Sequence, residues 1–189
     1  MNVRRVNPEL SACGLNCGLC PRYHTDGASR CPGCGGEGFF DKRPSCGIIS
    51  CNQRHGGVEF CFLCDEYPCK KYDGVDQVDS FITHRNMLHD FERAAKDGLP
   101  NYLAELKEKM GHLDRLLDAY NDGRSKSLFC TAVNLLPIED VHQIMQALEQ
   151  QAMTQQTPKE RAQLAAQLLR QAADARDIDL TLRKNKPSK

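Results

Sequence analysis

The sequence predicts a fold in two parts, a cysteine-rich N-terminal region of irregular knuckles and short helices followed by an all-α helical bundle. Ten of the eleven cysteines lie between residues 13 and 69, in a segment that is rich in glycine and proline and poor in apolar periodicity. From about residue 76 onward, apolar residues instead recur at the three-to-four spacing of amphipathic helices. We therefore divide the chain into a cysteine-rich metal-binding region, residues 1–74, and a helical region of about five helices, residues 75–189.

The clustered cysteines form pairs and triplets whose members are separated by two to four residues, and we see no internal repeat beyond these pairs. They are Cys13, Cys17, Cys20, Cys31, Cys34, Cys46, Cys51, Cys61, Cys64 and Cys69. Such spacing is typical of metal sites, because a tetrahedral ion needs four soft ligands at one point and a tight turn delivers two of them. We predict that all ten are metal ligands. The segment is expected to unfold without metal, because its apolar surface is too small to offset its chain entropy.

The most diagnostic pair is the CPGCG motif of residues 31–35. Proline presets the turn, and glycine permits a positive φ, so that backbone N–H groups can point at the sulfurs. These hydrogen bonds and the charge of a dication lower the pKa of a thiol until it binds as thiolate. The motif therefore predicts a metal knuckle.

The number of ligands limits the number of sites. Ten cysteines fill two four-ligand sites, and adding His24 and His55, which lie inside the cluster, supplies ligands for a third. We expect two or three ions and leave their pairing with cysteines open, although the interpretation that both histidines are exposed loop residues is favoured. The remaining histidines are expected on helix surfaces, and Cys130 is expected to be a buried structural thiol. These histidines are His84, His89, His112 and His142.

Zinc is the metal that best suits knuckles made only of thiolates. The alternative is an iron–sulfur cluster, which also takes four thiolates. The CxxxCxxC spacing of Cys13, Cys17 and Cys20 is that of radical S-adenosylmethionine enzymes, and Pro21 follows it. However, the chain lacks the alternating strand and helix pattern that would build a partial barrel around that cofactor.

The helical region contains five amphipathic segments. They cover about residues 79–98, 101–120, 127–136, 138–153 and 157 onward. Asp79 or Ser80 is expected to cap the first. The last has the clearest start, because Thr157 can act as N-cap and Glu160 completes a capping box. The final segment, residues 177–184, alternates and is expected to be extended.

Composition excludes several classes of protein. The formal net charge is zero, which argues against a nucleic-acid binder, since such a protein offsets phosphate charge with a basic surface. The first ten residues have no apolar core of a secretory signal, and no stretch is long and apolar enough to cross a membrane. We expect a cytoplasmic protein, in which thiols stay reduced and available to metal.

The assembled motifs resemble the domain of unknown function 3795 family, small cysteine-rich proteins of bacteria and archaea. The motifs are CGLNCGLCPRY, CPGC, CGIISC and CFLCDEYPC, which lie within residues 13–69. The resemblance extends more loosely through FITHRNM, YNDGRSKSLFCTAVNLL and the terminal LRK. All ten clustered positions carry cysteine. The resemblance implies a zinc-binding cytoplasmic protein and implies no reaction.

Three functions are consistent with these features. The first is a structural zinc module that binds an unknown protein partner or forms a homodimer. The second is an iron–sulfur redox or sensor protein, and the third is a zinc enzyme, for which nearby carboxylates would be needed. The candidate carboxylates are Asp26, Glu59, Asp65 and Glu66. Arg124 and Lys126 could also hold an anion at a helix start, although a solvated turn is the favoured interpretation.

Overall fold

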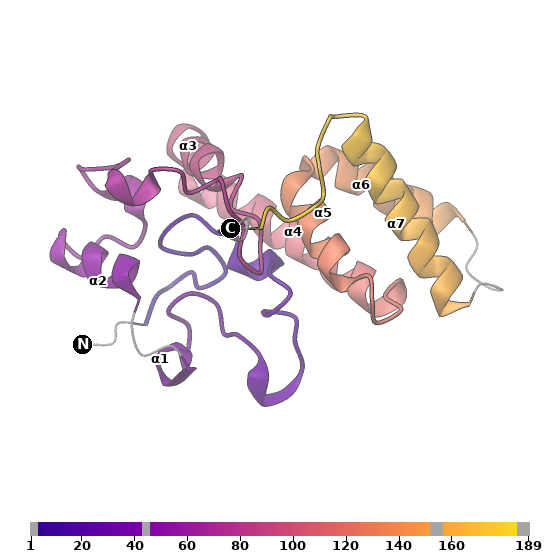
Figure 1. Ribbon diagram of the computed structural model, residues 1–189, viewed down its shortest axis with the longest axis horizontal. Helices are drawn as coiled ribbons and strands as arrows, with labels where there is room; N and C mark the ends of the chain where they lie inside the picture. Colours follow the sequence, from indigo (N-terminus) through magenta and orange to yellow (C-terminus); the bar gives the residue numbers. More distant parts are fainter. Residues whose placement is uncertain (1–3, 43–45, 152–156, 185–189) are drawn as a thin grey trace, which may run out of the picture. The chain divides into compact units, whose positions relative to one another are not determined.

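The computed structural model describes residues 4–42, 46–151 and 157–184 (Figure 1). Within these ranges the chain forms seven α-helices and no β-strand, which confirms the expected helical architecture. The helices are α1 Phe39–Lys42, α2 Gly47–Arg54, α3 Met87–Asp97, α4 Leu99–Ala119, α5 Lys126–Leu135, α6 Ile138–Gln150 and α7 Pro158–Asp174. Four 3-10 helices interrupt the cysteine-rich region, at Cys17–Leu19, Gly27–Ser29, Cys61–Leu63 and Lys70–Tyr72. Among the described residues, no helix has the length and apolarity that a bilayer span requires.

The chain divides into two compact units. Unit 1 contains Met1–Ala104 together with Leu182–Lys189, and unit 2 contains Glu105–Thr181. Helix α4 begins in unit 1 and ends in unit 2. This division reflects how the chain packs. The predicted boundary after residue 74 instead marks the end of the cysteine cluster, and that boundary of the metal-binding region stays a prediction.

The C-terminal segment returns to unit 1 through Asp79. The backbone N–H of Arg183 donates to the Asp79 carboxylate at 2.7 Å, and the backbone N–H of Asp79 donates to the Arg183 carbonyl at 2.8 Å. The Arg183 guanidinium also donates to the Asp76 carbonyl. The described part of the final segment is irregular rather than a strand, because its backbone pairs with a loop.

Helix α3 begins later than the sequence predicts. Asp79 does not cap it, because the Asp79 carboxylate accepts hydrogen bonds from the Thr83 hydroxyl and from the backbone N–H of His84. These local bonds hold the segment as a loop, since a carboxylate that satisfies nearby backbone groups competes with helix formation. The helix runs from Met87 to Asp97, and Gly98, whose φ is +93°, stops it as expected.

The other helices follow the predicted boundaries closely. Helix α4 is continuous to the Asn-Asp-Gly turn, and α7 has the predicted capping box. The Thr157 backbone N–H donates to the Glu160 carboxylate at 2.7 Å, and the Glu160 N–H donates to the Thr157 hydroxyl at 3.3 Å. The predicted end of the fourth segment, near residue 153, lies outside the described residues.

The core of unit 2 lies between its helices. Helix α7 packs against α5 and α6, and Figure 1 shows α6 and α7 side by side. The largest fully buried side chains of unit 2 are Leu113, Leu116, Phe129, Val133, Leu136, Val141, Leu148 and Leu169. Cys130 is buried among them, as expected of a structural thiol. The Lys109 ammonium donates to the Leu136 carbonyl at 2.7 Å, which satisfies the end of α5.

An aromatic cluster joins α3 to the cysteine-rich segment of unit 1. The ring of Phe91, which is fully buried on α3, lies 4.9 Å from that of Phe62, 5.8 Å from that of Tyr67 and 6.2 Å from that of Phe60. Such edge-on and tilted pairs stabilise a fold beyond their buried area. The cysteine-rich region therefore shares a core with the first long helix.

A buried hydrogen-bond chain makes a second connection within unit 1. The Asn16 side-chain amide donates to the Asp90 carboxylate at 2.9 Å, and the Tyr102 hydroxyl donates to the Asn16 amide oxygen at 2.8 Å. All three residues are buried. Because Asn16 lies between Cys13 and Cys17, these bonds link the first thiols to α3 and to the start of α4.

We predict that Asn16→Ala destabilises unit 1 by about 2–3 kcal/mol, because it leaves a buried carboxylate and a buried hydroxyl short of a partner. Hydrogen exchange of the α3 amides measures the loss. The matched control is Asn101→Ala, because Asn101 is exposed and bonds only to the nearby Asp97 carbonyl. Equal protection of α3 in the two variants would contradict the prediction.

Candidate metal centre

Two cysteine pairs of unit 1 share one local geometry. Cys17-x2-Cys20 and Cys61-x2-Cys64 each form a 3-10 helix in which the second cysteine N–H donates to the first cysteine carbonyl, at 3.1 and 3.0 Å. In each case a tyrosine three residues further on, Tyr23 or Tyr67, donates its N–H to the second cysteine carbonyl. Two of the cysteine pairs thus share the longer pattern Cys-x-Leu-Cys-x-x-Tyr.

The two copies differ in the burial of their leucine. Leu19 is fully buried in the first copy, whereas the side chain of Leu63 is 50% exposed in the second. The same local turn therefore contributes to the core in one place and presents an apolar side chain to solvent in the other.

The CPGCG motif forms a turn held to two other segments of unit 1. Cys31 N–H donates to the Arg22 carbonyl at 2.9 Å, and Cys34 N–H donates to the Pro8 carbonyl at 2.8 Å. Gly33 has a φ of +83°, and a Cβ atom there would collide with the Pro8 carbonyl oxygen. Only glycine fits this close approach, as the motif predicts.

Cys17 is an electrostatic neighbour of Cys20, Cys31 and Cys34, and we call these four cysteines the four-thiol group; Cys34 is also a neighbour of Cys13 and Cys46. Burial raises the pKa of the Cys17 thiol well above its ordinary value, and repulsion from the thiols of Cys34, Cys13, Cys20 and Cys31 raises it further. Cys20 and Cys31 are also electrostatic neighbours. Turns far apart in the sequence thus bring two cysteine pairs together.

A second neighbourhood, the second thiol group, centres on Cys61. Burial raises the pKa of Cys61, and electrostatic repulsion from the thiols of Cys69 and Cys51 raises it further. Cys13 interacts in the same way with Cys61 and Cys46. The Cys61 thiol lies 3.3 Å from the side-chain oxygen of Asn52.

Backbone N–H groups point at several of these sulfurs. Burial raises the pKa of Cys20, whereas hydrogen bonds from the N–H groups of Arg22 and Tyr23 lower it. Burial likewise raises the pKa of Cys34, and a bond from the backbone of Ala12 lowers it. Donors aimed at sulfur stabilise a thiolate, the form that binds metal, so the donor set fits a zinc or iron ion.

The thiols do not have the spacing of a closed tetrahedral site. All eleven cysteines are described and all are free thiols. Among the described residues, no three cysteine sulfurs lie within 4.8 Å of one another. Since Zn–S bonds are about 2.3 Å long, a bound ion would need rotation of these side chains toward a common point.

The two histidines of the cluster have different surroundings. The His24 Nε2 lies 2.7 Å from the Gly18 carbonyl oxygen, which engages that nitrogen. The His55 Nδ1 lies 3.7 Å from the Cys64 sulfur and 3.7 Å from the Glu66 carboxylate. Only His55 is shown beside a thiol, and a ligand role for either histidine stays a prediction.

The candidate carboxylates are either occupied or exposed. Glu59 accepts hydrogen bonds from the backbone and side chain of Asn7, and it lies 3.7 Å from the Arg5 guanidinium. Asp26, Asp65 and Glu66 are exposed.

Arg5 is an organising residue of unit 1 that sequence reasoning missed. Its side chain is 5% exposed, and its guanidinium donates to the carbonyls of Leu10, Cys34 and Glu59 at 2.8–3.1 Å. It also lies 4.9 Å from the centre of the Phe60 ring. The planar guanidinium has enough N–H donors to bond to three carbonyls at once. In the sequence Arg5 is simply one of two adjacent arginines, and no local pattern marks it as buried.

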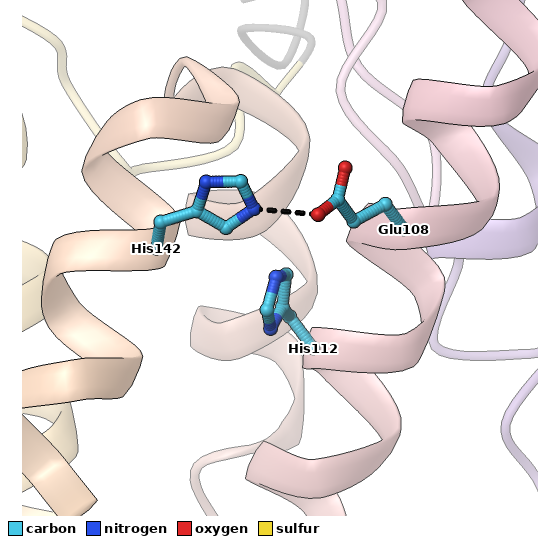
Figure 2. A group of neighbouring side chains, drawn as sticks. All are labelled: Glu108, His112 and His142. Carbon is cyan, nitrogen blue, oxygen red and sulfur yellow. Dashed lines mark hydrogen bonds and ion pairs between the residues drawn. The ribbon is translucent and has the colours of Figure 1, made fainter.

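A further group of ligand types lies in unit 2, on helices whose histidines were expected to be ordinary surface residues. Glu108, His112 and His142 each offer a ligand atom, and these atoms all lie within 4.8 Å of one another (Figure 2). Burial lowers the pKa of His112, and His142 lowers it further, whereas Glu108 raises it. The signal in the sequence was the spacing of Glu108 and His112, which places them on one helix face.

In the turn before α5, the carboxylate of Asp122 occupies the backbone N–H groups that could otherwise bind an external anion. The Asp122 carboxylate accepts hydrogen bonds from the backbone N–H groups of Arg124 and Ser125 at 3.0 and 3.1 Å and from the Ser125 hydroxyl at 2.9 Å. These donors lower the pKa of Asp122. This arrangement supports the favoured interpretation of a solvated turn rather than an anion site.

These features define a class, a helical protein whose cysteine-rich N-terminal region gathers its thiols on knuckles and 3-10 turns. Residues 9–74 match the model of the family described as protein of unknown function (DUF3795). The match confirms the resemblance that the motifs predicted. Neither the curated proteins nor the solved structures gave a match.

We predict that Arg5→Lys destabilises unit 1 by about 2 kcal/mol, because an ammonium cannot reach all three carbonyls. Thermal unfolding and the rate of proteolysis within residues 5–35 measure the change. The control is Arg4→Lys, because Arg4 is exposed and pairs only with Glu37 at 3.3 Å, a contact of little consequence for stability. A larger effect at Arg4 than at Arg5 would refute the role assigned here.

Proposed function

We propose that residues 11–72 form a zinc-stabilised module in which the metal is structural and the protein acts by binding a partner. The observation that carries the proposal is the four-thiol group, in which four buried or half-buried cysteines from two turns are neighbours. Four thiolates complete the tetrahedral shell that structural zinc prefers. The N–H donors to Cys20 support the same assignment.

We assign the four thiolates of the four-thiol group as the ligands of the first ion. A second ion would take four ligands from among the second thiol group, Cys64 and His55. This grouping is supported by electrostatic proximity, because Cys61 has Cys51 and Cys69 as neighbours and Cys64 has His55. The ions would join turns that otherwise share few apolar contacts.

A structural role is better supported than catalysis. An ion with four thiolates has no open position for water, which a catalytic zinc needs. The nearby carboxylates are occupied by Arg5 and Asn7 or are exposed. The protein therefore acts through its surface rather than through a reaction at the ion.

The partner-binding surface is proposed to include the second Cys-x-Leu-Cys turn. Leu63 is half exposed there, whereas its counterpart Leu19 is fully buried. An apolar side chain on a rigid turn is a suitable anchor for a protein partner. The partner is another protein or a second copy of this chain.

Cysteine substitutions test the grouping. Cys31→Ser is expected to release about one zinc ion per chain, because three thiolates remain where four are needed. The double variant Cys17→Ser/Cys31→Ser should release no more than either single variant if both cysteines hold one ion. Zinc per chain is measured by elemental analysis of protein purified without oxygen.

The matched control for this series is Cys130→Ser, because Cys130 is buried on α5 in unit 2, outside the cysteine cluster, and its replacement should leave all zinc bound. Losses that add in the double variant would overturn the grouping of Cys17 with Cys31. Equal zinc loss from the Cys130 variant would overturn the location of the site.

Chelation tests the structural role of the metal. Removal of zinc is expected to expose the amides of residues 11–72 to hydrogen exchange, and also those of α3, because Phe91 and Asp90 pack against that region. Helices α5, α6 and α7 have their own core and should stay protected. If the cysteine-rich amides keep their protection after complete metal removal, the metal does not hold the fold.

An iron–sulfur cluster is the second candidate, and one observation favours it. Cys13, Cys17 and Cys20 have the CxxxCxxC spacing, and Cys17 has both of the others as electrostatic neighbours. The same anaerobic preparation separates the candidates, because a cluster gives a brown protein with iron and sulfide, whereas zinc gives a colourless one.

A further inference from the structure

We infer that Glu108, His112 and His142 form a second kind of metal site, which takes a divalent transition-metal ion in unit 2. This site would be independent of the cysteine-rich region, because all three residues belong to Glu105–Thr181. It does not depend on the proposed function of the thiols. Its ligands are two imidazoles and a carboxylate, a set that differs in chemistry from the thiol groups.

The geometry brings three ligand atoms to one place. Glu108 and His112 are four residues apart on α4 and therefore project from the same face, one turn apart. His142 projects from α6, and its Nε2 lies 2.7 Å from the Glu108 carboxylate. Figure 2 shows the His112 ring beside this pair, with its centre 5.0 Å from that of the His142 ring.

The His112 ring supplies the second observation. Both of its nitrogens are buried, and neither has a hydrogen-bond partner among the described residues. Buried ring nitrogens are normally paired, because an unpaired polar group loses its hydration without compensation. A metal ion bound by one nitrogen would use the lone pair of the His112 ring, which no described residue engages by hydrogen bonding.

The two helices that carry the ligands are also joined beyond the group. Arg115 on α4 forms an ion pair with Glu149 on α6, one to two turns C-terminal to the ligands. Leu113 and Leu116 on α4 and Leu148 on α6 are fully buried in the same part of these helices. Ligands on packed helices keep their positions better than ligands on loops, so the site is preorganised.

The ligand set selects the class of metal. Imidazole nitrogen suits zinc, copper, nickel and iron, whereas magnesium and calcium prefer shells made of oxygen. Two histidines and one glutamate leave a position for water, as in zinc sites with an exchangeable ligand. Glu108 is exposed and the two histidines are half buried, so an ion can reach the site from solvent.

The test uses the full chain without a histidine tag, with its thiol sites filled with zinc beforehand, and titrates it with Co²⁺. The expected result is uptake of one Co²⁺ per chain, with visible d–d bands, with no thiolate-to-cobalt charge-transfer band, and with shifted imidazole nitrogen signals for His112 and His142. His142→Gln should lose this equivalent. Glu108→Gln, whose amide oxygen can still accept from His142, should bind Co²⁺ more weakly because the ligand charge is gone.

The matched control is His89→Gln, because His89 is exposed on α3 and should not affect the uptake. Circular dichroism establishes that each variant keeps its helices. Failure of the wild-type chain to bind the additional ion would overturn the proposal, and so would retention of that ion by His142→Gln. Uptake that produces a thiolate charge-transfer band would also overturn it, because the ion would then be in the cysteine-rich region.

Discussion

The hydrogen bonds of the Asn16 side chain connect the cysteine-rich segment to the helices of unit 1. The Asn16 amide lies between Cys13 and Cys17 in sequence, accepts from Tyr102 and donates to Asp90. Both partners are buried, so the amide cannot exchange either bond for water at no cost. A side chain that is not itself a proposed ligand therefore links the first knuckle to α3 and to the start of α4.

Arg5 acts in a comparable way on other segments of unit 1. Its guanidinium serves carbonyls on three segments, including that of Cys34, and it is covered by Phe60. Unit 1 therefore combines two kinds of connection: polar side chains that satisfy backbone groups of irregular segments, and an aromatic cluster around Phe91. Irregular backbone can be buried only if its polar groups are paired in this way.

Local signals were sufficient for much of the helical region. The capping box at Thr157 and the stop at Gly98 depend on neighbouring residues, so the sequence predicts them well. The start of α3 was predicted too early, because the Asp79 carboxylate bonds to Thr83 and His84 instead of capping the helix, and also accepts from Arg183, which is 104 residues away. The contacts of Arg5 and Asn16 and the approach of His142 to Glu108 join distant segments, and no local pattern encodes them. The cysteines were found by spacing alone, whereas their neighbours depend on how the turns pack.

The return of the C-terminal segment to Asp79 has a consequence for the order of events during synthesis. Unit 2 is an insertion in the chain of unit 1, since residues on both sides of it belong to the same compact unit. A ribosome releases Arg183 only after all of unit 2 has been made, so unit 1 is assembled in two stages. The thiols emerge early, and the backbone pairing that closes the loop at Asp79 is added last. Unit 2 can therefore begin to fold before the folding of unit 1, which is synthesised first, is complete.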